Sequence, residues 1–178
     1  MPCAPDAPPL YVVVMGVAGC GKSVVGALLS ERLAIPLVEG DDFHPDDNIR
    51  KMREGVPLTD ADRAGWLQRL GEQLRLQPKG AVLTCSALKT AYRDALRAAV
   101  PDLHFLHLSL SPHQAMERVA ARTDHFYPPS LVASQFEALQ DPAAEPRVHA
   151  VNATQHVDRI VDAAVRWLRP VQAAFNNA

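Results

Sequence analysis

The residues from Gly16 to Ser23 match the phosphate-binding pattern G-x-x-x-x-G-K-[ST] without a mismatch. Glycines at this spacing let backbone N–H groups approach phosphate oxygens, and a following helix adds partial positive charge. Lys22 is expected to reach the β- and γ-phosphates of a nucleoside triphosphate, and the Ser23 hydroxyl to ligate Mg²⁺. The expected nucleotide-binding loop comprises Gly16, Val17, Ala18, Gly19, Cys20, Gly21, Lys22 and Ser23.

A carboxylate follows the second expected strand, which covers residues 35–38 and runs into Glu39-Gly40-Asp41-Asp42. Asp41 at this position is suited to accept the proton of an attacking hydroxyl or to hold Mg²⁺. His44 and Lys51, a few residues further, are suited to hydrogen-bond a polyol or to pair with a carboxylate. The residues alone leave a second interpretation open, an acidic solvated loop with a helix cap at Asp46 or Asp47.

Four further basic residues are candidates for the same site. Lys89 and Arg93 follow the third expected strand, and a solvated helix face explains them equally well. Arg118 and Arg122 are four residues apart and therefore share one helix face, directly before a proline-rich segment where a lid is expected. Lid arginines can stabilise a transferring phosphoryl group, whereas the alternative is again a solvated basic face.

The elements that must position these residues alternate between strand and helix. An apolar β-branched run at 10–15 predicts a buried strand before the loop, and Val25, Leu28, Leu29 and Leu33 predict a helix over 22–33. Further strands are expected at 35–38, 81–85, 103–110 and 148–151, and further helices at about 60–74, 88–99, 112–122, 131–139 and 157–168. Such alternation predicts a parallel sheet with helices on both faces and ligands at the carboxyl ends of its strands.

The whole chain sets wider limits. Its 178 residues fit one domain, and the net charge of −2 gives no indication of nucleic-acid or membrane binding. The three cysteines form no C-x-x-C pair, and no apolar stretch approaches the length of a membrane span. Residues 1–9 contain four prolines and are expected to form a disordered leader rather than a signal peptide, which makes the cytoplasm the default location.

Three blocks of the sequence resemble the short P-loop gluconokinases. The first contains G-D-x-x-H-P-x-x-N-x-x-K-M from Gly40 and continues to Leu67, and the second is C-S-A-L-K-x-x-Y-R from Cys85. The third runs from Arg118 through His125-Phe126 and Ser134-Gln135-Phe136 to Pro142. The resemblance covers about residues 11–142, and three long motifs in order are far more specific than the phosphate loop alone.

The resemblance implies ATP-dependent phosphorylation of D-gluconate at its 6-hydroxyl, with Mg²⁺, by a cytoplasmic homodimer. It also implies a nucleoside-monophosphate-kinase-like three-layer α/β/α fold. This fold has a five-stranded parallel sheet in the order 2-3-1-4-5, in one domain spanning 10–178, with a mobile lid at about 123–146.

The resemblance also assigns roles to the candidate residues. Lys22, Asp41 and Arg122 are the expected catalytic residues, Arg118 joins the nucleotide site, and Trp66 is expected to serve packing. The expected gluconate site comprises Asp41, His44, Lys51, Arg63, Lys89 and Arg93.

The chain departs from the family pattern in the lid. Thr123-Asp124 stands where relatives often have a basic residue and a glycine, and Gln140 stands where glutamate is common.

Two rival functions remain: a kinase of the same fold for shikimate or another small acid or polyol, and a nucleotide-dependent switch without turnover. Against the switch, Thr84-Cys85-Ser86 stands where a Walker-B aspartate is expected.

Overall fold

The computed structural model of the chain describes residues 8–123 and 127–175. Five parallel strands form one sheet in the order β2-β3-β1-β4-β5, which confirms the expected order. The strands are β1 (Leu10–Met15), β2 (Leu37–Glu39), β3 (Gly80–Thr84), β4 (His104–Ser109) and β5 (Val148–Asn152). Most of the expected leader, residues 1–7, lies outside the described residues.

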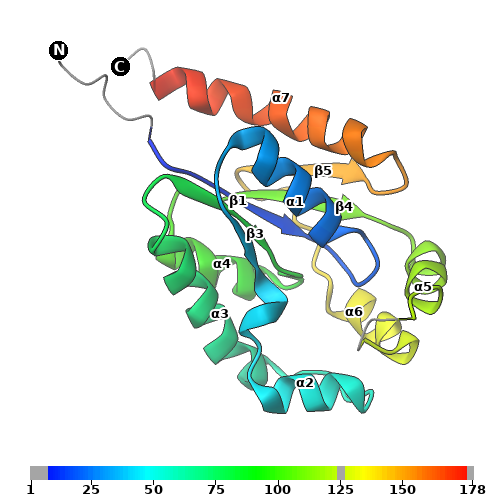
Figure 1. Cartoon of the computed structure of the whole chain (residues 1–178). Coiled ribbons are helices and arrows are strands. Elements are labelled where there is room, and N and C mark those ends of the chain that lie inside the picture. Colours follow the sequence, from blue (N-terminus) through cyan, green and yellow to red (C-terminus); the bar gives the residue numbers. More distant parts are fainter. Residues whose placement is uncertain (1–7, 124–126, 176–178) are drawn as a thin grey trace.

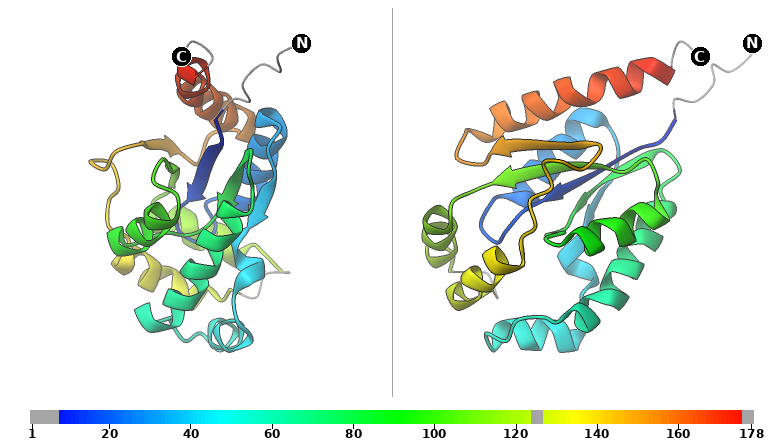
Figure 2. Two further views of the ribbon diagram at one scale, coloured as in Figure 1. Left: turned by 90° about the vertical axis from the view of Figure 1, so that its left-hand side faces the viewer. Right: turned by 180° about the vertical axis from the view of Figure 1, so that it is seen from behind.

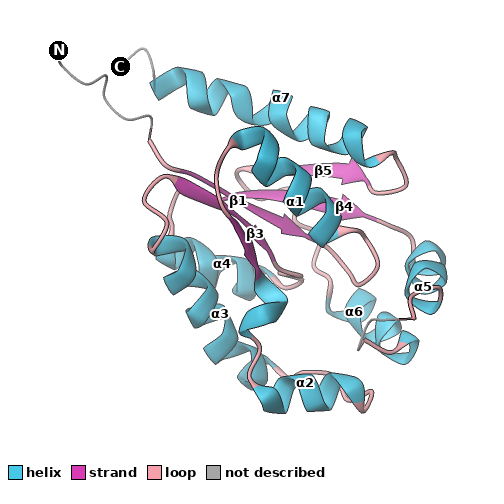
Figure 3. Ribbon diagram, in the orientation of Figure 1, coloured by secondary structure: helices cyan, strands magenta, loops and turns pink. Residues whose placement is uncertain are grey.

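Helices cover both faces of this sheet, so the fold has three layers (Figures 1 and 3). The helices α1 and α7 lie on one face and α3 and α4 on the other, as the rotated views also show (Figure 2). The helices are α1 (Lys22–Leu33), η1 (Gly40–Phe43), α2 (Asp46–Arg53), α3 (Asp60–Arg75), α4 (Thr90–Ala99), α5 (Pro112–Ala120), η2 (Pro129–Leu131), α6 (Val132–Ala138) and α7 (Val157–Phe175). Among the described residues, none of these helices has the length and apolarity needed to cross a membrane.

The central strand β1 is buried on both faces, as its unbroken apolar run requires. Val12 and Val14 face the cluster formed with α1 and α7, whereas Val13 and Met15 face the cluster formed with α3 and α4. Alternation of side chains along one strand therefore links two apolar cores.

The register of the strands brings three loops to one edge of the sheet. Val14 of β1 is opposite Thr84 of β3, and Thr84 is opposite Glu39 of β2. The segments that follow these strands, including the phosphate loop and the Gly40–Phe43 turn, therefore emerge side by side.

One region differs from the expectation. The polar stretch between the second strand and Thr59, for which the sequence offered only a helix cap at Asp46 or Asp47, forms η1 and α2. Asp46 and Asp47 lie in the first turn of α2 and three basic residues in its last turn, so these charges interact favourably with the helix dipole. Thr59 is the N-cap of α3, which begins where a helix was expected, and forms a capping box with Asp62.

Candidate active site

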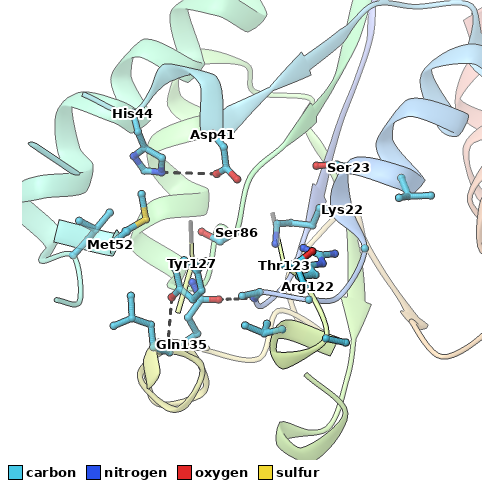
Figure 4. Close-up of a pocket in the computed structure, with 18 of the residues that line it drawn as sticks. Lys22, Ser23, Asp41, His44, Met52, Ser86, Arg122, Thr123, Tyr127 and Gln135 are labelled. Atoms are coloured by element: carbon cyan, nitrogen blue, oxygen red, sulfur yellow. Dashed lines mark hydrogen bonds and ion pairs between the residues drawn. The ribbon is translucent and has the colours of Figure 1, made fainter. Parts of the chain in front are cut away.

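A cavity of about 540 Å³ opens at the carboxyl ends of the strands (Figure 4). Its walls come from the phosphate loop, the turn after β2, the helices α2 and α3, and the segment between α5 and α6. It is lined by Ala18, Gly19, Gly21, Lys22, Ser23, Val24, Asp41, His44, Met52, Leu58, Arg63, Ser86, Val119, Ala121, Arg122, Thr123, Tyr127, Leu131 and Gln135.

The phosphate loop presents its second half to this cavity. Gly21 caps α1 in the left-handed conformation, with φ of 95°, which a residue with a side chain adopts only with strain. The Lys22 ammonium donates to the carbonyls of Gly16 and Val17 at 3.1 and 3.2 Å and so lies across the loop. Cys20 is 1% exposed and does not line the cavity, which favours packing over reactivity for its thiol.

A carboxylate that the sequence analysis did not select lies beside Ser23. The Ser23 hydroxyl donates to Glu39 Oε1 at 2.9 Å, and the Thr84 hydroxyl donates to the same oxygen. Glu39 is the last residue of β2, so its position as a carboxylate at a strand end could have identified it from the sequence. Hydroxyl and carboxylate oxygens are the ligands that Mg²⁺ prefers, and Ser23 and Glu39 therefore fit such an ion.

Gly40 explains how the next residue reaches the cavity. A Cβ atom on Gly40 would lie 2.0 Å from the Thr84 carbonyl oxygen, so only glycine allows the turn to press against β3. The carbonyl of Gly40 also accepts a hydrogen bond from Trp66 Nε1 at 2.8 Å. The tight turn places the half-exposed Asp41 at the cavity wall, while Trp66 is buried and packs, as expected.

His44 lies next to Asp41 and is buried. Its ring stacks on Trp66 with the ring centroids 4.1 Å apart, and its Nε2 lies 3.9 Å from Asp41 Oδ1 (Figure 4). Burial lowers the pKa of His44 to about 4; the Asp41 charge opposes this shift and the Arg63 charge adds to it. The imidazole is therefore neutral at physiological pH.

Arg63 supplies a cation to the same part of the cavity. Its Nε is buried and has no hydrogen-bond partner among the described residues. Its guanidinium lies over the Tyr92 ring, 5.5 Å from the ring centroid. A buried donor without a partner costs free energy, and an anionic ligand would remove that cost.

The side of the cavity that includes α6 is connected to the phosphate loop. Gln135 Oε1 accepts a hydrogen bond from the Ala18 backbone N–H at 2.6 Å, and the Gln135 side chain also bonds to Tyr127. Burial raises the pKa of Tyr127 to about 12, so its hydroxyl stays protonated. Arg122 and Thr123 line the cavity on the same side as Lys22 (Figure 4).

Arg118 lies behind the loop rather than in the cavity lining. Its guanidinium donates to the Gly19 carbonyl at 3.3 Å and to the Ala153 carbonyl at 2.9 Å. This arginine therefore connects the phosphate loop to the segment after β5.

Lys51 and Lys89, expected to bind substrate, lie outside the cavity lining. Lys51 forms an ion pair with Asp62 at 2.7 Å, and Lys89 forms one with Asp60 at 2.8 Å. Hydrogen bonds from Lys51 and from Thr59 lower the pKa of Asp62 to about 2. Both lysines thus connect α3 to a neighbouring element, and their roles as substrate ligands stay predictions.

Arg93 is also outside the lining, and its side chain is fully buried. It forms a bidentate contact with Glu145 and donates to the carbonyls of Ala87, Leu88 and Gln140. These contacts hold the segment after α6 to the loop before α4. A substrate role for Arg93 stays a prediction, and its geometry is that of a structural residue.

Comparisons with known proteins agree with this architecture. The shikimate kinase family model matches residues 18–166. The gluconokinase of Gluconobacter oxydans is 43% identical over 161 residues, covering 89% of this chain and 90% of that protein. The thermosensitive gluconokinase of Escherichia coli is 41% identical over 136 residues, covering 75% of this chain and 73% of that protein.

A solved structure extends the match to three dimensions. The gluconokinase from Sinorhizobium meliloti has 46% identity and a TM-score of 0.85, covering 93% of this chain and 95% of that one. The shikimate kinase family model thus matches most of the chain, but the relatives that are 41–46% identical to it are gluconokinases. The chain belongs to the gluconokinase family.

Proposed function

We propose that this protein transfers the γ-phosphoryl group of ATP to the 6-hydroxyl of D-gluconate, giving 6-phospho-D-gluconate and ADP. One observation carries the proposal: a single cavity joins the phosphate loop to Asp41, His44 and Arg63. Such a cavity has a phosphate end and an acid-binding end, as a kinase for a small sugar acid requires. Among the possible acids, the similarity to gluconokinases indicates gluconate as the substrate.

The phosphate end binds the nucleotide. Backbone N–H groups of the loop cradle the phosphates, Lys22 contacts the β- and γ-phosphates, and Arg122 approaches the transferring group. Arg118 supports the loop from behind through Gly19. Ser23 and Glu39 would hold Mg²⁺, which neutralises charge on the phosphate oxygens when bound.

The acceptor end binds gluconate. Arg63 pairs with the carboxylate, and Asp41 and His44 contact the far end of the sugar acid. The 6-oxygen attacks the γ-phosphorus, the hydroxyl proton passes to Asp41, and the bond to the β–γ bridging oxygen breaks so that ADP leaves. Because His44 is neutral, it adds no second positive charge beside Asp41, and that carboxylate remains able to accept the proton.

The segment at about 123–146 is the proposed lid within a single kinase domain spanning 10–178. Closure of a lid excludes water and limits ATP hydrolysis. A cytoplasmic homodimer without nucleic-acid or membrane partners completes the proposal, supported by the family and by the small net charge.

The test is ADP release with ATP and Mg²⁺ in the presence of D-gluconate, shikimate or D-glucose. The proposal predicts strong stimulation by gluconate alone. Stimulation by shikimate would instead support the rival kinase of the same fold. Stimulation by none of the three would favour a nucleotide switch.

A further inference from the structure

We infer that Asn48 is a positioning residue that sets which nitrogen of His44 carries the proton, so that a neutral Nε2–H donor faces Asp41. The inference rests on the proposed function only in giving Asp41 the role of proton acceptor. Asn48 lies on α2, is 3% exposed, and does not line the cavity. It acts through His44 and does not touch the substrate.

The orientation of the Asn48 amide follows from its surroundings. One Asn48 atom lies 2.9 Å from the backbone carbonyl oxygen of Asp62, and a carbonyl oxygen only accepts hydrogen bonds. That atom must therefore be the amide nitrogen Nδ2. The opposite orientation would place two acceptor oxygens against each other inside the protein.

The same nitrogen then determines the form of His44. Asn48 Nδ2 lies 3.3 Å from His44 Nδ1 and has a second hydrogen to donate. His44 Nδ1 must therefore accept, and in a neutral imidazole the proton is on Nε2. Because Nε2 lies 3.9 Å from Asp41 Oδ1, the N–H is on the side of the ring that faces the carboxylate.

Neighbouring groups keep the ring in this state. Trp66 stacks on one face of His44 and restricts its rotation, and Trp66 is itself held by the Gly40 carbonyl. The charged groups that act on the imidazole are Asp41 on η1 and Arg63 on α3. Their effects on the pKa of His44 are opposite in sign, so burial keeps the ring neutral.

This arrangement places a neutral N–H beside Asp41. A neutral N–H directed at one carboxylate oxygen leaves the other oxygen for the acceptor hydroxyl, without adding a positive charge that would make Asp41 a weaker base. The hydrogen-bonded chain runs from the Asp62 carbonyl through Asn48 to His44, and the His44 Nε2–H lies 3.9 Å from Asp41, an electrostatic contact rather than a hydrogen bond. The opposite tautomer would set a nitrogen lone pair against the carboxylate.

The direct test is ¹⁵N NMR of the histidine rings in the wild-type protein at pH 7. The His44 signals are assigned as those that disappear in a His44→Gln variant. We expect an unprotonated Nδ1 and a protonated Nε2 for His44. A protonated Nδ1 would overturn the inference, whether or not gluconate is phosphorylated, so this result is independent of the proposed function.

An isosteric variant tests the consequence for catalysis. In Asn48→Asp the new carboxylate attracts a proton to Nδ1 and raises the pKa of His44, so the wild-type neutral Nε2–H form is lost. At pH 8 we expect kcat with gluconate to fall on the order of tenfold to a hundredfold, with KM for ATP unchanged. At pH 6 the loss should persist, because the imidazolium carries a proton on Nε2 but also adds a positive charge that makes Asp41 a weaker base; the unchanged KM for ATP separates this effect from a general structural defect.

Arg50→Gln is the matched control. It changes the charge of α2 by the same amount at an exposed residue that pairs only with Asp47 among the described residues, and it should leave kcat within about twofold. Equal turnover of Asn48→Asp and the wild type at pH 8 would overturn the inference. Thermal melting checks that the variant folds, and if it does not, the wild-type NMR experiment decides alone.

Discussion

The two ends of the cavity are constructed in different ways. The phosphate end consists mainly of one continuous segment, residues 16–23, whose backbone and Lys22 face the nucleotide site. The acceptor end brings together single side chains from η1, α2, α3 and the segment around α6, among them Asp41, Met52, Arg63 and Tyr127. A short motif therefore specifies the first end, whereas the second depends on how several elements pack.

The cations near the acceptor end show the same contrast. Arg63 lines the cavity with an Nε that has no hydrogen-bond partner among the described residues. Lys51, Lys89 and Arg93 instead form ion pairs with carboxylates outside the lining. Positive charge that is already paired stabilises the fold, and only positive charge left in the cavity is available to a ligand.

The largest effect is expected for Asp41→Asn. The variant keeps the shape of the side chain but cannot accept the hydroxyl proton, so kcat with gluconate should fall by about 10²- to 10⁴-fold. KM for ATP should change less than about twofold, because Asp41 is not part of the phosphate loop. Steady-state kinetics measure both, and turnover close to the wild type would remove Asp41 from the mechanism.

The next effect concerns stability and separates Arg93 from the cavity residues. Arg93→Met leaves Glu145 paired with Arg97 alone and removes the donor to three backbone carbonyls, so it should lower the free energy of unfolding by about 3 kcal/mol. Urea denaturation measures this loss. KM for gluconate should stay close to the wild-type value at temperatures where the variant is folded; a large rise in KM without loss of stability would return Arg93 to the substrate site.

Arg63→Gln should weaken substrate binding, whereas Arg93→Met should lower stability. Loss of a charge-assisted pair with the gluconate carboxylate is expected to raise KM for gluconate by about 10- to 100-fold, with KM for ATP unchanged. Lys89→Gln is the matched control, since it removes a cation that is paired with Asp60 outside the cavity. If the two variants behaved alike, the contrast between paired and available cations would not hold.

The smallest effect is a pH dependence of stability. Burial raises the pKa of Glu145, but hydrogen bonds and charges from Arg93 and Arg97 outweigh it and bring the pKa to about 2. A lowered pKa adds stability above the ordinary value of 4.5, and this contribution disappears as the pH falls toward 2. Urea midpoints between pH 6 and 3 should therefore fall less steeply for Glu145→Gln; parallel curves would contradict this.

Sequence patterns predicted the structure correctly where the residues that determine a feature are contiguous in the chain. The Gly16–Ser23 motif, the apolar run of β1 and the helical spacing over 22–33 depend on contiguous residues, and the structure has the loop, strand and helix that they predicted. Sheet order came from the resemblance to a known family and is confirmed.

Other features depend on contacts between distant residues. Glu39 meets Ser23 only because β2 and β3 pair in one register, and Arg93 meets Glu145 across 52 positions of sequence. No local pattern indicates whether a lysine or arginine will find such a partner. The sequence therefore supplied the candidate cations, and packing separates those in the cavity from those in ion pairs.

The central claim is that Arg63 holds the carboxylate of gluconate while Asp41 faces the hydroxyl at the other end of the molecule. The most direct measurement is ¹³C NMR of the product formed from uniformly ¹³C-labelled gluconate, ATP and Mg²⁺. Coupling to phosphorus through the ester oxygen identifies the carbon that carries the phosphoryl group. The account predicts this coupling at C6 and not at C2, C3 or C4, whereas a phosphoryl group on a carbon near the carboxylate would contradict it.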